Sequence, residues 1–191
     1  AGAAITSGAY NTIVGADAGD AITIGTQNIA LGSNALASET IGDRAVAVGA
    51  YALFSQVSDS DNEDTGNTAV GNTAGYYNVT GTNNTYIGRA AGQGVTGNSN
   101  SNNTAVGKGA LTANTTGGSN VAIGVSAMGL SSTAVDNAVC IGFEAGKGAN
   151  HANSDGIVAI GYQAGLVADS TLGCVFIGYK AGTDVVSGGN N

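Results

Sequence analysis

The sequence predicts an all-β protein, a parallel β-solenoid or β-roll of about ten coils, on three observations. A large aliphatic residue followed by Gly, two variable residues and Ala recurs ten times. The Gly residues of these units lie 17 to 22 residues apart, which fits one coil of a stacked β structure and is too short for a helical repeat. The residues before each Gly alternate in type as in a β-strand. The ten Gly positions are 15, 32, 49, 71, 88, 107, 124, 142, 161 and 178.

Composition limits the classes of protein that fit this chain. The repeat units run from about 11 to 182, so we expect a single domain over 1–191. Gly is frequent, but the absence of Pro and of a three-residue period excludes collagen. A net charge of −8 with only five Lys and Arg residues argues against nucleic acid and anionic membranes as partners. No apolar stretch is long enough to span a membrane, and Ala1 begins no recognisable signal peptide, so an export signal or anchor would lie outside these residues.

Each unit is expected to begin with a short strand. In 67–71, Thr68 and Val70 share one face, and Asn67 and Ala69 share the other. The residue before Gly is always Val, Leu or Ile, and we expect its face to form the core. The opposite face carries Ala in six units, which indicates that another surface, such as a neighbouring chain, comes close. The other four units have Ile13, Tyr86, Cys140 and Phe176 at this position.

The rest of each unit is expected to form a corner and an outer loop. Gly after the strand permits a positive φ or a close backbone approach, and the Ala three residues later fits a tight inward site. Gly or Leu/Met follows that Ala, which indicates two local packings. Stacking would place Asn residues 11, 28, 67, 84, 103 and 120 in one column, where their side-chain amides can bond from coil to coil.

The runs 120–127 (NVAIGVSA) and 158–164 (VAIGYQA) resemble the head repeats of trimeric autotransporter adhesins, and are similar to repeats in tail fibres of bacterial viruses. The resemblance covers essentially all units from Asn11 to Gly182. It implies a left-handed parallel β-roll, three copies of which pack into a homotrimeric head that attaches to surfaces. It also implies an extracellular, cell-surface or virion location.

An enzyme is not expected. Val-Gly-x-x-Ala also matches the hexapeptide of left-handed β-helix acyltransferases, but those coils carry three hexapeptides and need a catalytic or metal-binding His. The single His, His151, lies in a polar loop without a recognisable partner. Neither a catalytic triad, nor a zinc spacing, nor a phosphate-binding loop is recognisable.

The longest insertion, between the third and fourth units, is acidic and makes calcium a candidate cofactor. Carboxylates are hard ligands that suit calcium, although the loop lacks the Gly and the distal Glu of an EF-hand. A solvated acidic loop is the competing interpretation. The candidate calcium ligands are Asp59, Asp61, Glu63 and Asp64.

An aromatic column is the candidate ligand-binding site. Phe143, Tyr162 and Tyr179 each follow the corner Gly in the last three units, so stacking aligns them. They form either a platform for sugar rings or a self-stacked ladder. Tyr76 and Tyr77 are a second aromatic spot.

The sequence therefore predicts a non-enzymatic structural and adhesive fibre segment, a homotrimer that binds a surface glycan or protein receptor through many weak contacts. Two alternatives stay open: a subunit of a homopolymeric extracellular filament, and an ice- or surface-binding solenoid. Two features count against ice binding: the column containing Thr68, Thr85 and Thr104 has Ile or Val in most other units, so a regular outward Thr column is missing, and the column is expected to face inward.

Overall fold

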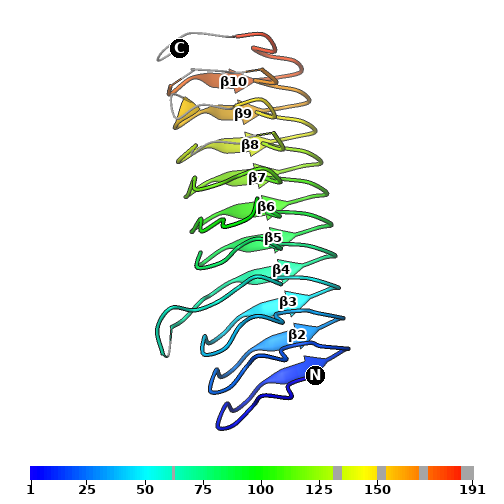
Figure 1. Ribbon diagram of the computed structural model, residues 1–191. Coiled ribbons are helices and arrows are strands. Elements are labelled where there is room, and N and C mark those ends of the chain that lie inside the picture. The colour runs from blue at the N-terminus through cyan, green and yellow to red at the C-terminus, as the bar shows by residue number, and fades with distance from the viewer. Residues whose placement is uncertain (62, 131–134, 150–153, 168–171, 186–191) are drawn as a thin grey trace.

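In the part of the chain that the structure describes, ten parallel strands form one stack, one strand from each repeat unit (Figure 1). The computed structural model describes residues 1–191 except 62, 131–134, 150–153, 168–171 and 186–191. The strands follow sequence order in a single sheet, so the predicted all-β parallel solenoid is confirmed. They are β1 (Thr12–Val14), β2 (Ile29–Leu31), β3 (Val46–Val48), β4 (Thr68–Val70), β5 (Thr85–Ile87), β6 (Thr104–Val106), β7 (Val121–Ile123), β8 (Val139–Ile141), β9 (Val158–Ile160) and β10 (Val175–Ile177).

Each coil adds one three-residue strand to the sheet, and equivalent residues pair directly. Ile29 lies beside Val46, and Leu31 lies beside Val48. The same register continues through every neighbouring pair, including β3 and β4, where the longest insertion loops out of the stack (Figure 1). The predicted columns of equivalent residues are therefore present.

The Gly after each strand is required by its positive φ, and all of these Gly residues except Gly178 are also required by close approach to the next coil. All ten have φ between 126° and 139°, a conformation that side chains disfavour. In addition, a Cβ built on Gly88 would lie 2.7 Å from the carbonyl carbon of Gly107 in the next coil. The corners therefore pack backbone against backbone.

The Asn column binds the coils together mainly through the backbone. Asn28 Oδ1 accepts a hydrogen bond from Ala45 N at 2.9 Å, and Asn28 Nδ2 donates to Gly42 O at 2.8 Å. Asn103 makes the equivalent bonds to Asn120 N and Gly117 O. The expected amide-to-amide bond is found between Asn84 Nδ2 and Asn67 Oδ1, at 3.1 Å.

The two faces of the strands are the reverse of the expectation from sequence. The middle residue of β2–β9 is fully buried, as Ala69 and Tyr86 illustrate, whereas Val70 and Ile87 before the corners are 37% and 41% exposed. A 17-residue coil encloses so little space that mainly small residues fit inside, and the branched side chains lie outside. The prediction that the Ala face meets another chain is wrong for the same reason, because Ala fills the coil's own interior.

The coil interior is filled by large side chains at two alternative positions. Where the strand centre is Ala, the residue four positions after the corner Gly can be a buried Leu or Met, as in coils 2, 3, 6 and 7. Where the centre is large, that position is Gly: a Cβ on Gly92 would overlap the Tyr86 ring, and one on Gly182 would overlap Phe176. The two packings expected from the Gly or Leu/Met alternation are thus explained except in coils 4 and 9, where Ala69 and Ala159 occur with Gly75 and Gly165.

Candidate functional site

One face of the sheet lies on the outer surface and is uncharged, and we call it the aliphatic face. It consists of the first and third residues of all ten strands, and every one of them is at least partly exposed. Sixteen of the twenty are Val, Ile or Leu and four are Thr, so the face has no charge along its whole length. Its end residues Val14 and Ile177 are 63% and 66% exposed.

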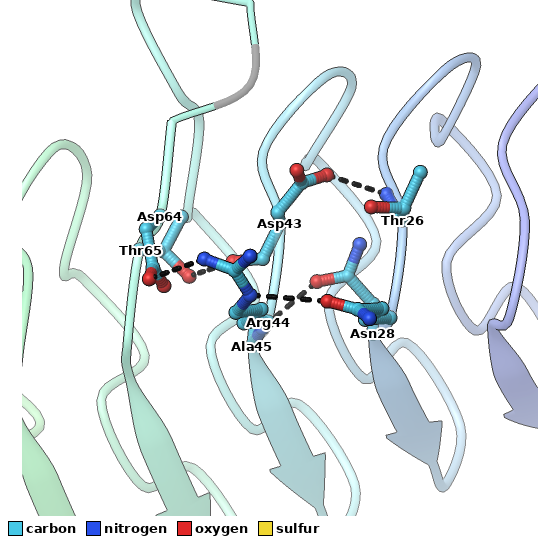
Figure 2. A network of polar contacts seen from close by, with 8 residues as sticks. Thr26, Asn28, Asp43, Arg44, Ala45, Asp64 and Thr65 are labelled. Atoms are coloured by element: carbon cyan, nitrogen blue, oxygen red, sulfur yellow. Dashed lines mark hydrogen bonds and ion pairs between the residues drawn. The ribbon is translucent and has the colours of Figure 1, made fainter.

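The aliphatic face has a polar border. The residue two positions before each strand has a positive φ and is exposed in most coils, as Gln27, Arg44 and Asn83 are. Arg44 forms an ion pair and hydrogen bonds across three neighbouring coils along this border (Figure 2). An apolar strip with a polar rim has the composition of a protein contact surface.

Phe143, Tyr162 and Tyr179 come together as the column arrangement predicts. Their ring centroids are 5.3 Å and 5.2 Å apart, with interplanar angles of 8° and 10°. Lys180 Nζ lies 5.6 Å from the centroid of the outermost ring, Tyr179. A sugar ring stacks on an open aromatic face, but these faces are largely turned toward one another. The geometry favours the ladder, and sugar binding by this column stays a prediction.

A polar contact between coils lies next to the aromatic ladder, where Glu144 and Gln163 follow Phe143 and Tyr162. Glu144 accepts hydrogen bonds from Lys147 Nζ at 2.5 Å and from Gln163 Nε2 at 2.8 Å. These bonds, first of all the one from Lys147, lower the pKa of the Glu144 carboxyl group. The coils are therefore linked here by side chains as well as by the backbone.

The second aromatic spot is larger than the sequence indicated. Tyr76 stacks on Phe54 with centroids 5.0 Å apart, and Tyr77 meets Tyr76 edge-on at 4.5 Å. Tyr51 completes the cluster at tilted angles. Sequence reasoning missed Tyr51 and Phe54 because they lie one coil away from Tyr76, and only the stacking joins them.

The acidic insertion does not assemble the expected calcium ligands. Glu63 Oε2 accepts a hydrogen bond from Asp59 N at 3.1 Å, and Asp64 Oδ2 lies 2.6 Å from the guanidinium of Arg44 (Figure 2). Among the described residues, no three His, Cys, Asp or Glu side chains are grouped so that they could hold a metal ion. Calcium binding by Asp59, Asp61, Glu63 and Asp64 stays a prediction from sequence.

A buried carboxylate anchors this insertion, and sequence reasoning missed it. Glu39 Oε1 accepts hydrogen bonds from the backbone N–H groups of Thr40, Ile41 and Gly42, and also from Ser58 N. Its Oε2 accepts a bond from Ser58 Oγ at 3.1 Å. Glu39 therefore fixes the start of the insertion to the preceding coil and is fully engaged in structure.

Two further expectations concern His151 and the membrane. His151 lies outside the described residues.

Within the part of the chain that is described, there is no helix long and apolar enough to cross a membrane.

Comparison with known proteins gave no matching family model, no similar characterised protein and no similar solved structure.

Proposed function

We propose that this chain is a non-enzymatic structural and adhesive segment of an extracellular or virion fibre, and that it forms a homotrimer through its aliphatic face. The resemblance of the repeats to trimeric adhesin heads and tail fibres supports the class of protein and the number of copies. The structural observation that supports association is the exposed aliphatic face, because it gives the copies a surface on which to associate.

The size of the aliphatic face supports this proposal. Ten strands about 4.8 Å apart, each of three residues at about 3.3 Å, give roughly 450 Å² of flat area, and protruding side chains add to it. Monomeric proteins rarely expose contiguous apolar patches beyond about 300–600 Å². A stable interface takes about 800 Å² from each partner, so association of copies would also involve the polar border of the face. Contact between copies would remove this apolar surface from water.

Attachment would then depend on repetition. In a trimer the variable corner and loop residues are displayed three times around a stiff rod, and weak contacts with a surface glycan or protein receptor add up to firm binding. The aromatic cluster of Tyr51, Phe54, Tyr76 and Tyr77 and the ladder of Phe143, Tyr162 and Tyr179 lie outside the aliphatic face and stay available in this arrangement.

The oligomeric state tests the proposal. Light scattering coupled to size exclusion should give three times the chain mass of 18.3 kDa. The double variant Val106→Glu and Ile141→Glu places charges in the middle of the aliphatic face, and should dissociate the trimer because a buried unpaired charge is unfavourable. A wild-type chain that is monomeric at micromolar concentration would refute the proposal.

A matched control separates the aliphatic face from surface charge in general. Val57 and Val167 are 36% and 42% exposed and lie outside the strands. The variant Val57→Glu and Val167→Glu changes the net charge equally and should remain trimeric. Trimer loss in this control would mean that charge, and not the aliphatic face, determines association.

Ice or surface binding is the second candidate, and one observation favours it. Thr68, Thr85 and Thr104 face outward with the aliphatic residues, so the inward orientation that counted against this function is wrong. The outward rows repeat about every 4.8 Å along the stack and about 6.7 Å along each strand, as a regular water-facing lattice would require. A monomer that shows thermal hysteresis would favour this function, whereas a trimer without it favours the fibre.

The homopolymeric filament is distinguished by the same light-scattering measurement. End-to-end stacking of coils would give a broad, concentration-dependent series of masses, whereas closed three-fold association gives one mass.

A further inference from the structure

The Thr residues of the aliphatic face are not scattered at random. Thr68, Thr85 and Thr104 begin three successive strands, β4, β5 and β6, and pair directly with one another. The strands on either side, β3 and β7, have Val46 and Val121 at the same position. At the first strand position the aliphatic face therefore has one polar band near its middle, with Ile or Val in β2–β3 and β7–β10 and one further Thr, Thr12, in β1.

The hydroxyl groups of this band are unused within the chain. In the part of the chain that the structure describes, the hydroxyls of Thr68, Thr85 and Thr104 have no hydrogen-bond partner, and the same holds for Thr12 in β1. By contrast, Thr23 and Thr65, which lie outside the strands, donate to backbone carbonyls of the neighbouring coil. The hydroxyls on the aliphatic face are thus free to bond to something outside the chain.

We propose that this Thr band sets the register in which copies of the chain associate. The inference rests on the proposed function, in which the aliphatic face lies between copies. A hydroxyl buried there without a partner is unfavourable, because it loses its bonds to water. Parallel copies in register place each Thr opposite its equivalents, and three hydroxyls around a three-fold axis can each donate to the next and accept from the previous one.

Any other register leaves hydroxyls unpaired. A shift of one coil brings Thr104 of one copy against Val121 of the next, and Thr68 of that next copy against Val46 of the first. A shift of three coils matches no member of the band with another member: Thr68 of one copy meets Thr12 of the next, and the remaining band residues meet Val or Ile. An antiparallel arrangement centred on β5 matches the band, but it places Thr12 against Val158. Only the parallel, in-register arrangement pairs all four Thr rows, as a single polar position does in an apolar coiled-coil seam.

Spin labels on the rim of the face test this register. A parent with Cys140→Ser and Cys174→Ser removes the native thiols, and Ser33→Cys, exposed at the corner after β2, carries the label. Pulsed electron paramagnetic resonance on the trimer should show one narrow distance between equivalent labels. The triple variant Thr68→Val, Thr85→Val and Thr104→Val should remain associated, with longer distances added from copies displaced by steps of about 4.8 Å.

The control substitutes Thr outside the face. Thr96→Val, Thr115→Val and Thr116→Val change the same number of hydroxyls in outer loops and should keep the single distance. If the variant Thr68→Val, Thr85→Val and Thr104→Val stays trimeric and shows one narrow distance, the inference is overturned and the proposed function remains intact. A monomeric wild-type chain shows no distance between copies and overturns both.

Discussion

At the residue scale, the corner glycines are the positions least able to change. Gly88 combines φ of 130° with a closest approach of 2.7 Å between a Cβ added to it and the backbone of Gly107. Gly88→Ala should therefore lower the free energy of unfolding by at least about 2 kcal/mol, since backbone strain and overpacking each contribute about 1–3 kcal/mol. Urea denaturation followed by circular dichroism measures this loss.

Gly97 is the matched control, because its φ of 81° is also positive but a Cβ added to it would have no atom within 4 Å. Gly97→Ala should cost only about 1 kcal/mol, the conformational part alone. Equal losses for the two variants would show that close approach between coils contributes nothing.

Two buried asparagines form a second pair at this scale. Asn28 uses both side-chain polar atoms in hydrogen bonds, whereas neither side-chain atom of Asn98 has a partner. Asn28→Leu leaves Ala45 N and Gly42 O buried without that partner and should cost about 2–5 kcal/mol. Asn98→Leu should change stability by less than about 1 kcal/mol in either direction. Thermal denaturation of both variants checks the contrast, and a larger loss at Asn98 would contradict it.

At the element scale, the strand and the following corner exchange volume within one coil. Tyr86 fills coil 5 from the strand centre, which leaves room only for Gly92 after the corner. Coil 6 uses the opposite solution, Ala105 with Leu111 at φ 54°. Since the backbone accepts Leu at this positive φ, one solution should convert into the other.

A double-mutant cycle tests this exchange. Tyr86→Ala alone should cost about 3–5 kcal/mol through an empty cavity, and Gly92→Leu alone should be destabilising because the new side chain overlaps Tyr86. The double variant should be more stable than the sum of the single losses predicts, by at least about 2 kcal/mol. The lost bond from Tyr86 Oη to Asn100 Oδ1 keeps the recovery incomplete. Additive losses would show that the two positions do not share one space.

The exchange of volume between the strand centre and the corner also shows which features of the fold could be predicted from the sequence. The repeat located every strand, corner Gly and inward Ala, because these follow from spacing alone. Alternation defined two faces but not which one is interior, and assigning the larger residues to the core gave the wrong answer. The sequence did contain a signal that the strand centres are interior. Wherever the strand centre is larger than Ala, the residue four positions after the corner Gly is Gly: Ile13, Tyr86, Cys140 and Phe176 occur with Gly at 19, 92, 146 and 182. The aromatic cluster and the Glu39 anchor join residues through loop geometry, which the period does not determine.

At the scale of the whole molecule, the solenoid is a one-dimensional stack in which each described strand pairs only with its neighbours in sequence. Such stacks lose structure from their ends, because a terminal coil has one interface and an internal coil has two. Cys140 in β8 and Cys174, directly before β10, are buried and not joined by a disulfide, so they can report opening at two distances from the end of the sheet.

Thiol labelling should therefore proceed in order along the stack. Burial raises the pKa of the Cys140 thiol to about 12, so at pH 8 it carries almost no thiolate and reacts only when its coil opens. With single-cysteine variants and an aromatic disulfide reagent, Cys174 should react at least about tenfold faster than Cys140, which corresponds to about 1.4 kcal/mol less for local opening. Equal labelling rates from water up to the unfolding transition would mean that all ten coils open as one cooperative unit, and the stack would not behave as a sum of neighbouring interfaces.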